Sequence, residues 1–470
     1  MPGVPQAITV APMSAKPPAP RVVVAGGGVA ALEAILALRA LAGRRPSITL
    51  LTPELEFAPP AASVASPFGF GPPAALALEP LAASYGVHLR HGTLESVDTT
   101  RRVAIAADGA PLEYDHLLIA VGGRRRAAVP GALTFRGPGD VDRVEALLDD
   151  MAAGRAERLV VAVPSRETWP LPAYELAIMA AVELRSRGLD APDIALVTPE
   201  AQPLEVFGPA AAEAVVALMR DRGVALHTAR TSVAVVDGWL RTAEGPTIPA
   251  DRVIALPGVG GPFLRGLPHD ARGFLPTDAH GRVTGCVDVY AAGDATTFPL
   301  RQGGLAAQQA DAAAEAIAVR LGSIAHARPF TPVLRGVLLT GGAPLYLRAV
   351  VGAHETPVAR RVRASHASSA GQRALWWPPA KVAGRYLAPL LSTARPPALL
   401  ATPMIDVGPR PAGGGGEDEA LALALALADE DARCGDYRQA LHALDAARAL
   451  TGGVLPEAYA AKQRDWLARA

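Results

Sequence analysis

The sequence of 470 residues predicts an α/β fold made of two units, each with a parallel sheet and flanking helices. Each unit opens with an apolar strand-like run, an Ala-rich helical run and a second strand-like run. These runs lie at 21–25, 29–41 and 48–51 in the first unit, and at 158–163, 174–188 and 194–200 in the second. Both second strands run into the tripeptide Thr-Pro-Glu, which is a weak internal repeat. Short apolar runs flanked by Gly, Pro and Asp, at 117–121, 252–256 and 287–291, suit further buried parallel strands.

Outside these two units the sequence is less regular. Residues 59–73 are rich in Pro and Gly and are expected to form a loop, and no clear periodicity extends over 330–400. The tail, 417–470, contains helical patterns at 417–431 and 437–450. We expect this tail to form a separate helical element, and it is a candidate to bind a protein partner.

The composition limits the possible partners and the compartment. Lys and Arg together number 45, as do Asp and Glu, so the chain has no overall attraction for nucleic acid. Two cysteines, Cys286 and Cys434, without metal-type Cys/His spacing predict neither a disulfide framework nor a metal site, and fit a cytoplasmic protein. No apolar run reaches the roughly 20 residues that span a bilayer. Residues 1–20 lack the pattern of a signal peptide and are expected to be a disordered leader.

The glycine turn after the first strand is the first candidate binding site. It reads Gly26-x-Gly28-x-x-Ala31 between a strand and a helix. Gly26 permits a tight turn, Gly28 lets the N–H groups of the helix start approach a pyrophosphate, and Ala31 lets helix and strand pack closely. The sequence therefore predicts a dinucleotide site that includes Val29 and Ala30. The alternative is an ordinary tight turn.

An acidic residue that binds a ribose hydroxyl is expected where the second strand ends. Thr52 occupies the position where this acid is commonest, and Glu54 follows two residues later. Glu54 is therefore the candidate ribose ligand. The alternative is a solvated glutamate in a turn.

Two later strand ends are also candidate contacts. One strand runs through Ala120 to Gly122, where a glycine would let the backbone lie under a flavin or an adenine. The other ends in Gly293-Asp294, where a carboxylate could accept a hydrogen bond from a ribityl hydroxyl. The alternative for Asp294 is an ordinary turn aspartate.

A helix is expected to start at Gly303 and Gly304. Its N-terminus would stabilise negative charge on a reduced flavin, because the helix dipole and free N–H groups point there. Gln308 and Gln309 follow in this helix and are expected on its surface.

In this order, the motifs resemble the pyridine-nucleotide-disulfide oxidoreductase superfamily, and within it the branch of sulfide:quinone oxidoreductases and type II NADH dehydrogenases. The resemblance covers roughly residues 20–400. It implies FAD as cofactor, bound by a Rossmann-like domain of residues 20–140 and 255–325. It further implies an inserted NAD(P)-binding-like domain at 141–254 and a C-terminal capping region at 326–400 that shapes the acceptor site.

The sequence departs from this family where a nicotinamide dinucleotide would bind. The turn at 162–174 contains no glycine, whereas Pro164, Pro170 and Pro172 lack N–H donors and Trp169 is large. The usual pyrophosphate cradle cannot form there, so we expect a degenerate second domain. Redox cysteines of the kind found in sulfide:quinone oxidoreductases are also missing, and sulfide chemistry is not supported.

The segment from Trp376 to Leu391 mixes aromatic, cationic and aliphatic residues. Trp377, Lys381, Arg385 and Tyr386 beside leucines suit a membrane interface, and predict peripheral contact with the inner face of a membrane. The alternative is a segment packed on the core or at a subunit interface.

Taken together, the sequence predicts an FAD-dependent oxidoreductase that passes electrons from a small-molecule donor to an acceptor, with a quinone as the candidate acceptor. One alternative is an NAD(P)H dehydrogenase with an atypical nicotinamide site. Another is a non-enzymatic scaffold or sensor with a flavoprotein fold. The sequence identifies no catalytic side chain.

Overall fold

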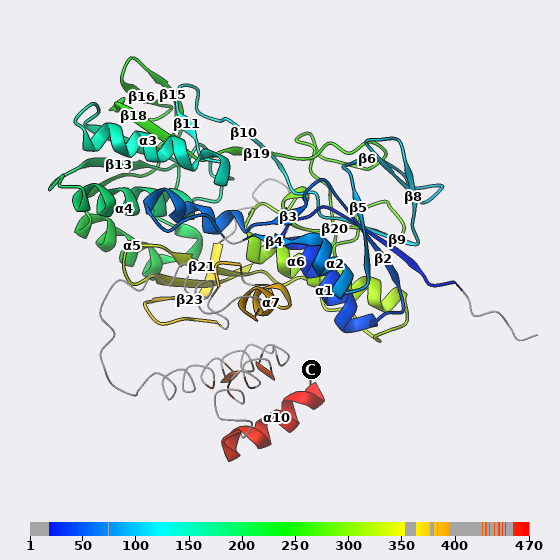
Figure 1. Cartoon of the computed structure of the whole chain (residues 1–470). Helices are drawn as coiled ribbons and strands as arrows, with labels where there is room; N and C mark the ends of the chain where they lie inside the picture. Colours follow the sequence, from blue (N-terminus) through cyan, green and yellow to red (C-terminus); the bar gives the residue numbers. More distant parts are fainter. Residues whose placement is uncertain are drawn as a thin grey trace, which may run out of the picture.

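The structure is a computed structural model, and it describes residues 18–73, 75–352, 363–376, 380–382, 384–393 and 455–469, with isolated positions between 425 and 447. Most of the expected leader, Trp377 and most of the two predicted tail helices lie outside the described residues. The α/β class predicted from the sequence is confirmed. Figure 1 shows two sheets side by side, each with helices beside it, and a third sheet (labels β21 and β23) below the second one.

The first sheet is parallel and has the strand order β20-β9-β1-β2-β5. Its strands are β1 (Arg21–Ala25), β2 (Ser47–Thr52), β5 (Val87–His91), β9 (His116–Ile119) and β20 (Val289–Ala291). These short apolar runs are buried on both faces, as parallel strands usually are. One face packs against α1 (Val29–Ala42) and α6 (Gly303–Arg320), and α2 (Leu78–Ser84) lies beside β5. The other face packs against an antiparallel sheet of β6 (Leu94–Asp98), β7 (Val103–Ala106) and β8 (Pro111–Glu113).

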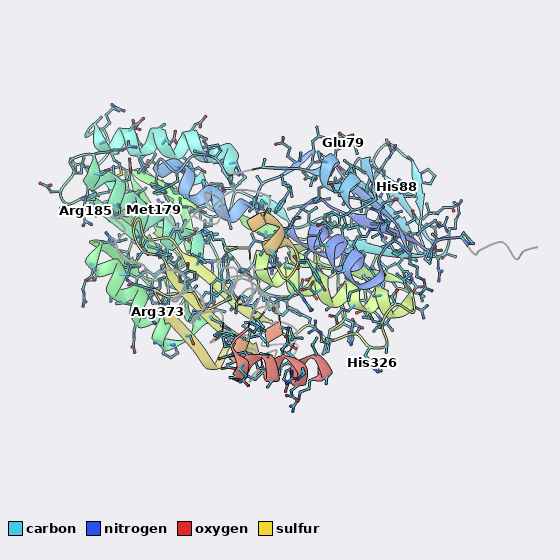
Figure 2. The ribbon with its side chains drawn as sticks, turned by 60° about the horizontal axis from the view of Figure 1, so that its bottom comes forward. Glu79, His88, Met179, Arg185, His326 and Arg373 are labelled. Atoms are coloured by element: carbon cyan, nitrogen blue, oxygen red, sulfur yellow. The ribbon has the colours of Figure 1, made fainter. Side chains whose placement is uncertain are left out.

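The second sheet repeats this plan, with the parallel order β11-β18-β12-β13-β14. Its strands are β11 (Leu133–Thr134), β12 (Arg158–Ala162), β13 (Asp193–Val197), β14 (Val224–His227) and β18 (Arg252–Ala255). Helices α3 (Val141–Ala152), α4 (Leu171–Ser186) and α5 (Pro209–Asp221) pack with its apolar residues in the largest core cluster. A small antiparallel sheet of β15 (Ser232–Val236), β16 (Trp239–Thr242) and β17 (Ile248–Pro249) covers the other face. In Figure 2, Met179 and Arg185 mark the region of α4, whereas Glu79 and His88 lie near the far end of the first sheet.

Two antiparallel segments connect the sheets, β10 (Arg124–Arg126) paired with β19 (Gly258–Gly260). The chain leaves the first sheet through β10, after β9, and returns to it through β19, before β20. The second sheet is therefore an insertion between strands that are neighbours in the first sheet.

Three expectations about local structure need correction. The predicted loop at 59–73 contains a 3-10 helix, η1 (Pro60–Phe68), in which the Ser63 hydroxyl donates to the carbonyl of Pro60 at 2.7 Å. Helix α4 begins at Leu171 rather than Tyr174, because proline is compatible with the first turn of a helix. The region after Phe330, for which the sequence shows no clear periodicity, contains an antiparallel sheet of β21 (Val333–Leu338), β22 (Leu345–Gly352) and β23 (Arg363–Gly371).

The C-terminal region is fixed to the first sheet by a buried carboxylate. Glu33 on α1 accepts hydrogen bonds from the backbone N–H groups of Tyr386 (2.6 Å) and Leu387 (2.8 Å) at the start of α7 (Leu387–Thr393). A Cβ on Gly384 would overlap the Glu33 carboxylate, so the chain needs glycine at this close approach. Burial raises the pKa of Glu33 to about 7. In the tail, α10 (Glu457–Arg469) contributes Trp466 to a small hydrophobic cluster that is separate from the other cores.

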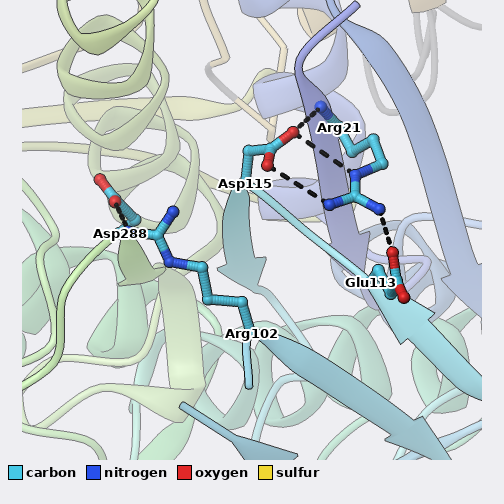
Figure 3. A network of polar contacts seen from close by, with 5 residues as sticks. All are labelled: Arg21, Arg102, Glu113, Asp115 and Asp288. Atoms are coloured by element: carbon cyan, nitrogen blue, oxygen red, sulfur yellow. Dashed lines mark hydrogen bonds and ion pairs between the residues drawn. The ribbon is translucent and has the colours of Figure 1, made fainter. Parts of the chain in front are cut away.

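A polar network holds the edge of the first sheet at which its parallel strands begin (Figure 3). Asp115 accepts hydrogen bonds from the backbone N–H of Arg21 at 2.7 Å and from its guanidinium, which also pairs with Glu113. Asp288, with a side chain 5% exposed, is bound by Arg102 at 2.9 Å. These polar groups occupy the N-terminal ends of the strands. Ligands of open α/β sheets bind at the opposite, C-terminal ends.

Candidate functional site

A cavity of about 430 Å³ lies where the strands of the first sheet end. Nine of the predicted site residues line it: Gly28, Val29, Ala30, Glu54, Ala120, Gly122, Gly293, Asp294 and Gly303. Gly26, Ala31 and Gly304 do not line it. Residues of the second sheet and of the C-terminal sheet complete the wall, among them Trp169, Leu256 and Val337. The structure therefore brings together residues from four distant parts of the chain in one concave site.

The three glycines of the first turn differ in what a side chain at each position would contact. Gly26 has φ of +123°, and a Cβ there would overlap the carbonyl group of Ala120. A Cβ on Gly27, which also lines the cavity, would overlap the Thr52 hydroxyl. At Gly28, by contrast, an added Cβ meets nothing within 4 Å. The fold therefore requires Gly26 and Gly27, whereas a side chain at Gly28 would enter open space on the wall of the cavity.

Glu54 lies beside this turn, at an exposed position on the cavity wall. Its carboxylate accepts a hydrogen bond from the Thr52 hydroxyl at 2.5 Å, and its backbone N–H donates to the same hydroxyl at 3.3 Å. This Thr-Pro-Glu turn holds the carboxylate near the glycine turn, since a Cβ on Gly27 would lie 3.0 Å from its oxygen. Its oxygens remain able to accept hydrogen bonds from a ligand.

The second Thr-Pro-Glu turn has the same internal hydrogen bonds. The Thr198 hydroxyl donates to the Glu200 carboxylate at 2.9 Å, and the Glu200 backbone N–H donates back to that hydroxyl at 3.3 Å. The sequence repeat therefore reflects a repeated structure. Here, however, Glu200 is buried, and the Tyr174 hydroxyl donates to its carboxylate at 2.8 Å. The acid that would bind a ribose in the second unit is thus closed off by a side chain from α4.

Burial raises the pKa of Glu200 to about 7, against the hydrogen bonds from Tyr174 and Thr198 that favour its charged form. In the unfolded chain a glutamate titrates near pH 4.3. The stability that the neutral carboxyl contributes is therefore fully present below about pH 4.3 and is lost as pH rises through about 7. We expect Glu200→Gln, which keeps an acceptor oxygen without the charge, to raise the free energy of unfolding at pH 8 by about 1–3 kcal/mol relative to wild type.

Urea unfolding of wild type and Glu200→Gln at pH 5 and pH 8 measures this effect. The exposed Glu54→Gln is the control variant and should not reproduce the difference between the two pH values. A Glu200→Gln variant that is destabilised equally at both would show that the carboxylate is held charged.

The loop that replaces the second glycine turn is fixed by ion pairs. Arg166 pairs with Glu205 at 3.0 Å, and Glu167 pairs with Arg272 at 2.6 Å. Trp169 packs edge-on against the ring of Phe207, with centroids 5.8 Å apart. The loop therefore forms a packed wall in which Thr168 and Trp169 line the cavity.

Asp294 follows β20 in a short 3-10 turn, after Gly293 with φ of +77°. The backbone N–H of Gly293 donates to the Gln309 side chain at 2.6 Å, which fixes this turn to α6. Burial raises the pKa of Asp294, whereas the positive charges of Arg125 and Arg301 oppose the shift. The expectation that Gln309 lies on the helix surface is wrong, since it is buried at this junction.

Helix α6 begins at the cavity, and its first turn is capped by Gln302, whose side chain accepts from the backbone N–H of Leu305 at 2.9 Å. Gly303 lines the cavity, whereas Gly304 is buried behind it. Gln308 is also not a free surface residue. Its side-chain N–H donates to the carbonyl of Val333, and its side-chain oxygen accepts from the N–H of Val333, each at 2.9 Å. Both glutamines connect α6 to its neighbours, which a helical pattern alone does not reveal.

A buried ion pair on the cavity wall was not identified from the sequence. Lys381 Nζ lies 2.7 Å from the carboxylate of Glu175 on α4, and the side chains are 7% and 0% exposed. Lys381 also donates to the carbonyl of Ala61 at 3.0 Å, and Glu175 accepts from the N–H of Leu339 at 2.9 Å. Burial raises the pKa of Glu175 and lowers that of Lys381, and each partner opposes the shift of the other.

The described residues of the predicted membrane segment pack on the protein core, as the alternative interpretation expects. Trp376 is 4% exposed and packs edge-on against Tyr346, with centroids 5.5 Å apart. Lys381 is held by Glu175, and Arg385 lies 3.9 Å from Glu315. These three amphipathic side chains therefore pack between elements of the protein itself and are largely withdrawn from its surface. Among the described residues, no helix has the length and apolar character needed to cross a bilayer.

Comparison with known proteins gives relatives of the same architecture. The sulfide:quinone oxidoreductase of Aquifex aeolicus is 20% identical, with a TM-score of 0.65 over 75% of this chain and 87% of that one. The ferredoxin reductase of the CYP199A2 system from Rhodopseudomonas palustris is 21% identical, with a TM-score of 0.56 over 72% of this chain and 84% of that one. At these identities the likeness shows the fold alone.

Sequence comparison adds a curated relative and a family. Apoptosis-inducing factor 3 from Mus musculus is 29% identical over 243 residues, which is 48% of this chain and 38% of that protein. This chain therefore matches well under half the length of that relative. The sequence profile of the pyridine nucleotide-disulphide oxidoreductases matches residues 20–316, and this chain belongs to that family of oxidoreductases.

Proposed function

We propose that the protein is an FAD-dependent oxidoreductase that passes electrons from a small-molecule donor to an acceptor, with a quinone as the acceptor. The observation that carries this proposal is the cavity at the end of the first sheet, where a glycine turn, a ribose-type carboxylate and a second carboxylate lie on one wall. Bound FAD would supply two-electron redox chemistry, which side chains alone cannot provide.

The residues of the cavity fit the parts of FAD in order. The open space at Gly28 and the N-terminus of α1 suit the pyrophosphate, because free N–H groups and the helix dipole favour negative charge there. Glu54 suits a ribose hydroxyl and Asp294 a ribityl hydroxyl. Gly303, at the N-terminus of α6, suits the part of the flavin that becomes negative on reduction.

The buried Glu175–Lys381 pair is a candidate to hold a proton at the cavity wall, which a redox reaction in the cavity could use. Both groups are removed from solvent, and opposing influences act on the pKa of each. The pair therefore holds a proton between Lys381 Nζ and the Glu175 carboxylate at the cavity wall.

The second unit argues against a nicotinamide dinucleotide as the donor. Its ribose-type acid, Glu200, is bound by Tyr174, and its glycine turn is replaced by a loop held by ion pairs. A quinone acceptor is supported by the likeness to a protein that is named for quinone reduction. The tail, with its own hydrophobic cluster, remains a candidate site for a protein partner.

An anaerobic titration of the purified protein tests the donor. We expect NADH, NADPH and sulfide each to leave the visible absorbance of the flavin unchanged or to bleach it slowly. Oxidation of chemically reduced protein by a soluble quinone should be fast. Rapid, saturable bleaching by NADH or NADPH at micromolar concentration would instead establish the dehydrogenase alternative.

Asp294→Ala should weaken FAD binding about ten- to a hundredfold, because a charge-assisted hydrogen bond of roughly 1.5–3 kcal/mol is lost. The fold should persist in the flavin-free form, since the substitution removes a group on the cavity wall. Asp294→Asn retains an acceptor oxygen and should lose less. Equilibrium dialysis of FAD against the flavin-free proteins measures all three affinities, and equal values for wild type and Asp294→Ala would leave Asp294 as a turn residue.

A further inference from the structure

Besides the predicted FAD ligands, the cavity is lined by several cationic side chains. Arg125, Arg136, Arg301 and Arg335 all contribute to its wall. The acidic residues Glu54, Glu56, Glu175 and Asp294 line the same cavity, and Glu175 is already paired with Lys381. Arg136 lies 3.6 Å from Asp140.

Arg301 is the best enclosed of these arginines. Arg301 lies in the chain between η4 (Gly293–Ala295) and α6, is 9% exposed, and has its guanidinium 3.9 Å from the centre of the Phe274 ring. One guanidinium nitrogen, Nη1, donates to the carbonyl of Pro299 at 3.2 Å. The Nε atom is buried and donates to no group of the described residues, and Arg301 forms no ion pair among them. Burying a guanidinium without a counter-ion is costly, and burial lowers the pKa of Arg301.

The acidic groups around Arg301 have other partners. Glu167 is paired with Arg272 at 2.6 Å. Asp270 accepts hydrogen bonds from the backbone N–H groups of Arg272 and Phe274, each at 2.9 Å. Asp294 attracts Arg301 but forms no ion pair with it within the described structure, and it is the predicted ligand of a ribityl hydroxyl. These acidic groups attract Arg301, but none of the described ones forms an ion pair with it, so its guanidinium N–H groups can bind a group that enters the cavity.

We propose that Arg301 forms an anion-binding subsite that takes the carboxylate group of a small organic acid, the donor of the reaction. The inference rests on the proposed function, because it assigns a chemical class to the substrate of the same cavity. A guanidinium matches a carboxylate through two parallel N–H···O bonds, and stacking on Phe274 fixes its plane before the ligand arrives. The subsite lies next to the loop of Thr168 and Trp169, where the second unit is closed to a dinucleotide.

The experiment uses the flavin-loaded protein and follows the visible spectrum of the flavin during titration with oxalate. Oxamide, an uncharged molecule of the same shape, is the ligand control. We expect saturable binding of oxalate and none of oxamide. Arg301→Gln should weaken oxalate binding about ten- to a hundredfold, and Arg301→Lys should lose less because it keeps the charge. Arg282→Gln, at an exposed arginine paired with Asp278 outside the cavity, should leave the affinity unchanged.

Three results would overturn the proposal. Oxalate affinity could be equal in wild type and Arg301→Gln, oxamide could bind as well as oxalate, or Arg301→Gln could lose its flavin, which would assign Arg301 to the cofactor. A wild-type protein that holds no flavin would refute the proposed function instead. In that case, calorimetric titration of oxalate into the flavin-free wild type and Arg301→Gln decides whether the subsite exists.

Discussion

Gly28→Val should abolish flavin binding while leaving the protein folded. An added side chain at this position meets no protein atom within 4 Å at its Cβ, so the first sheet and α1 can form as before. The same side chain would occupy the space in which a pyrophosphate approaches the N-terminus of α1, and would hold it away from the N–H groups. We expect affinity for FAD to fall more than about a hundredfold, the equivalent of about 2.7 kcal/mol.

Two other glycines serve as controls for this prediction. Gly139→Val also places a side chain in open space, but outside the cavity, and should keep its full flavin content. Gly26→Val should misfold, because its Cβ overlaps the Ala120 carbonyl at a positive φ. Flavin occupancy and circular dichroism of the three variants separate the two kinds of glycine. Full occupancy in Gly28→Val would place the pyrophosphate elsewhere.

Lys381→Met should destabilise the protein by about 3–5 kcal/mol, because it leaves the Glu175 carboxylate buried without its partner. Part of this cost disappears at low pH, where the carboxyl becomes neutral. Burial already raises the pKa of Glu175, and removal of Lys381 takes away the positive charge that opposes the shift. The loss of stability should therefore be smaller at pH 5 than at pH 8.

The double variant Glu175→Gln/Lys381→Met removes both charges and should recover most of the lost stability. Lys462→Met is the matched control, since Lys462 pairs with Asp429 but is 41% exposed, and it should cost less than about 1 kcal/mol. Urea unfolding of these variants gives the comparison. Equal losses in Lys381→Met and Lys462→Met would contradict a tightly coupled buried pair.

Local sequence patterns were sufficient for the core of the fold and for most of the residues that line the cavity at the end of the first sheet. The turn at Gly26–Gly28 and the strand end at Gly293-Asp294 are short segments whose backbone path follows from their own residues. The Thr-Pro-Glu repeat gave the correspondence between Glu54 and Glu200, because both turns make the same internal hydrogen bonds.

Long-range pairs were not predictable in this way. Glu175 and Lys381 are 206 residues apart, and neither segment alone shows that the other neutralises it. Lys381 beside Trp376 therefore suggested a membrane surface, whereas the fold buries both. The closure of Glu200 by Tyr174 likewise depends on how α4 packs on the second sheet. The C-terminal sheet was missed because no clear periodicity extends over 330–400, although β21, β22 and β23 pair in an antiparallel sheet that packs against helices of both units.

The most direct test of the account is the flavin content of the purified wild-type protein. The cofactor is released by denaturation, identified by chromatography and quantified against protein concentration. We predict FAD in equimolar amount, or full uptake of FAD by protein that is isolated without it. Protein that neither contains nor takes up FAD, while folded by circular dichroism, would contradict the account and favour a scaffold or sensor that keeps only the fold.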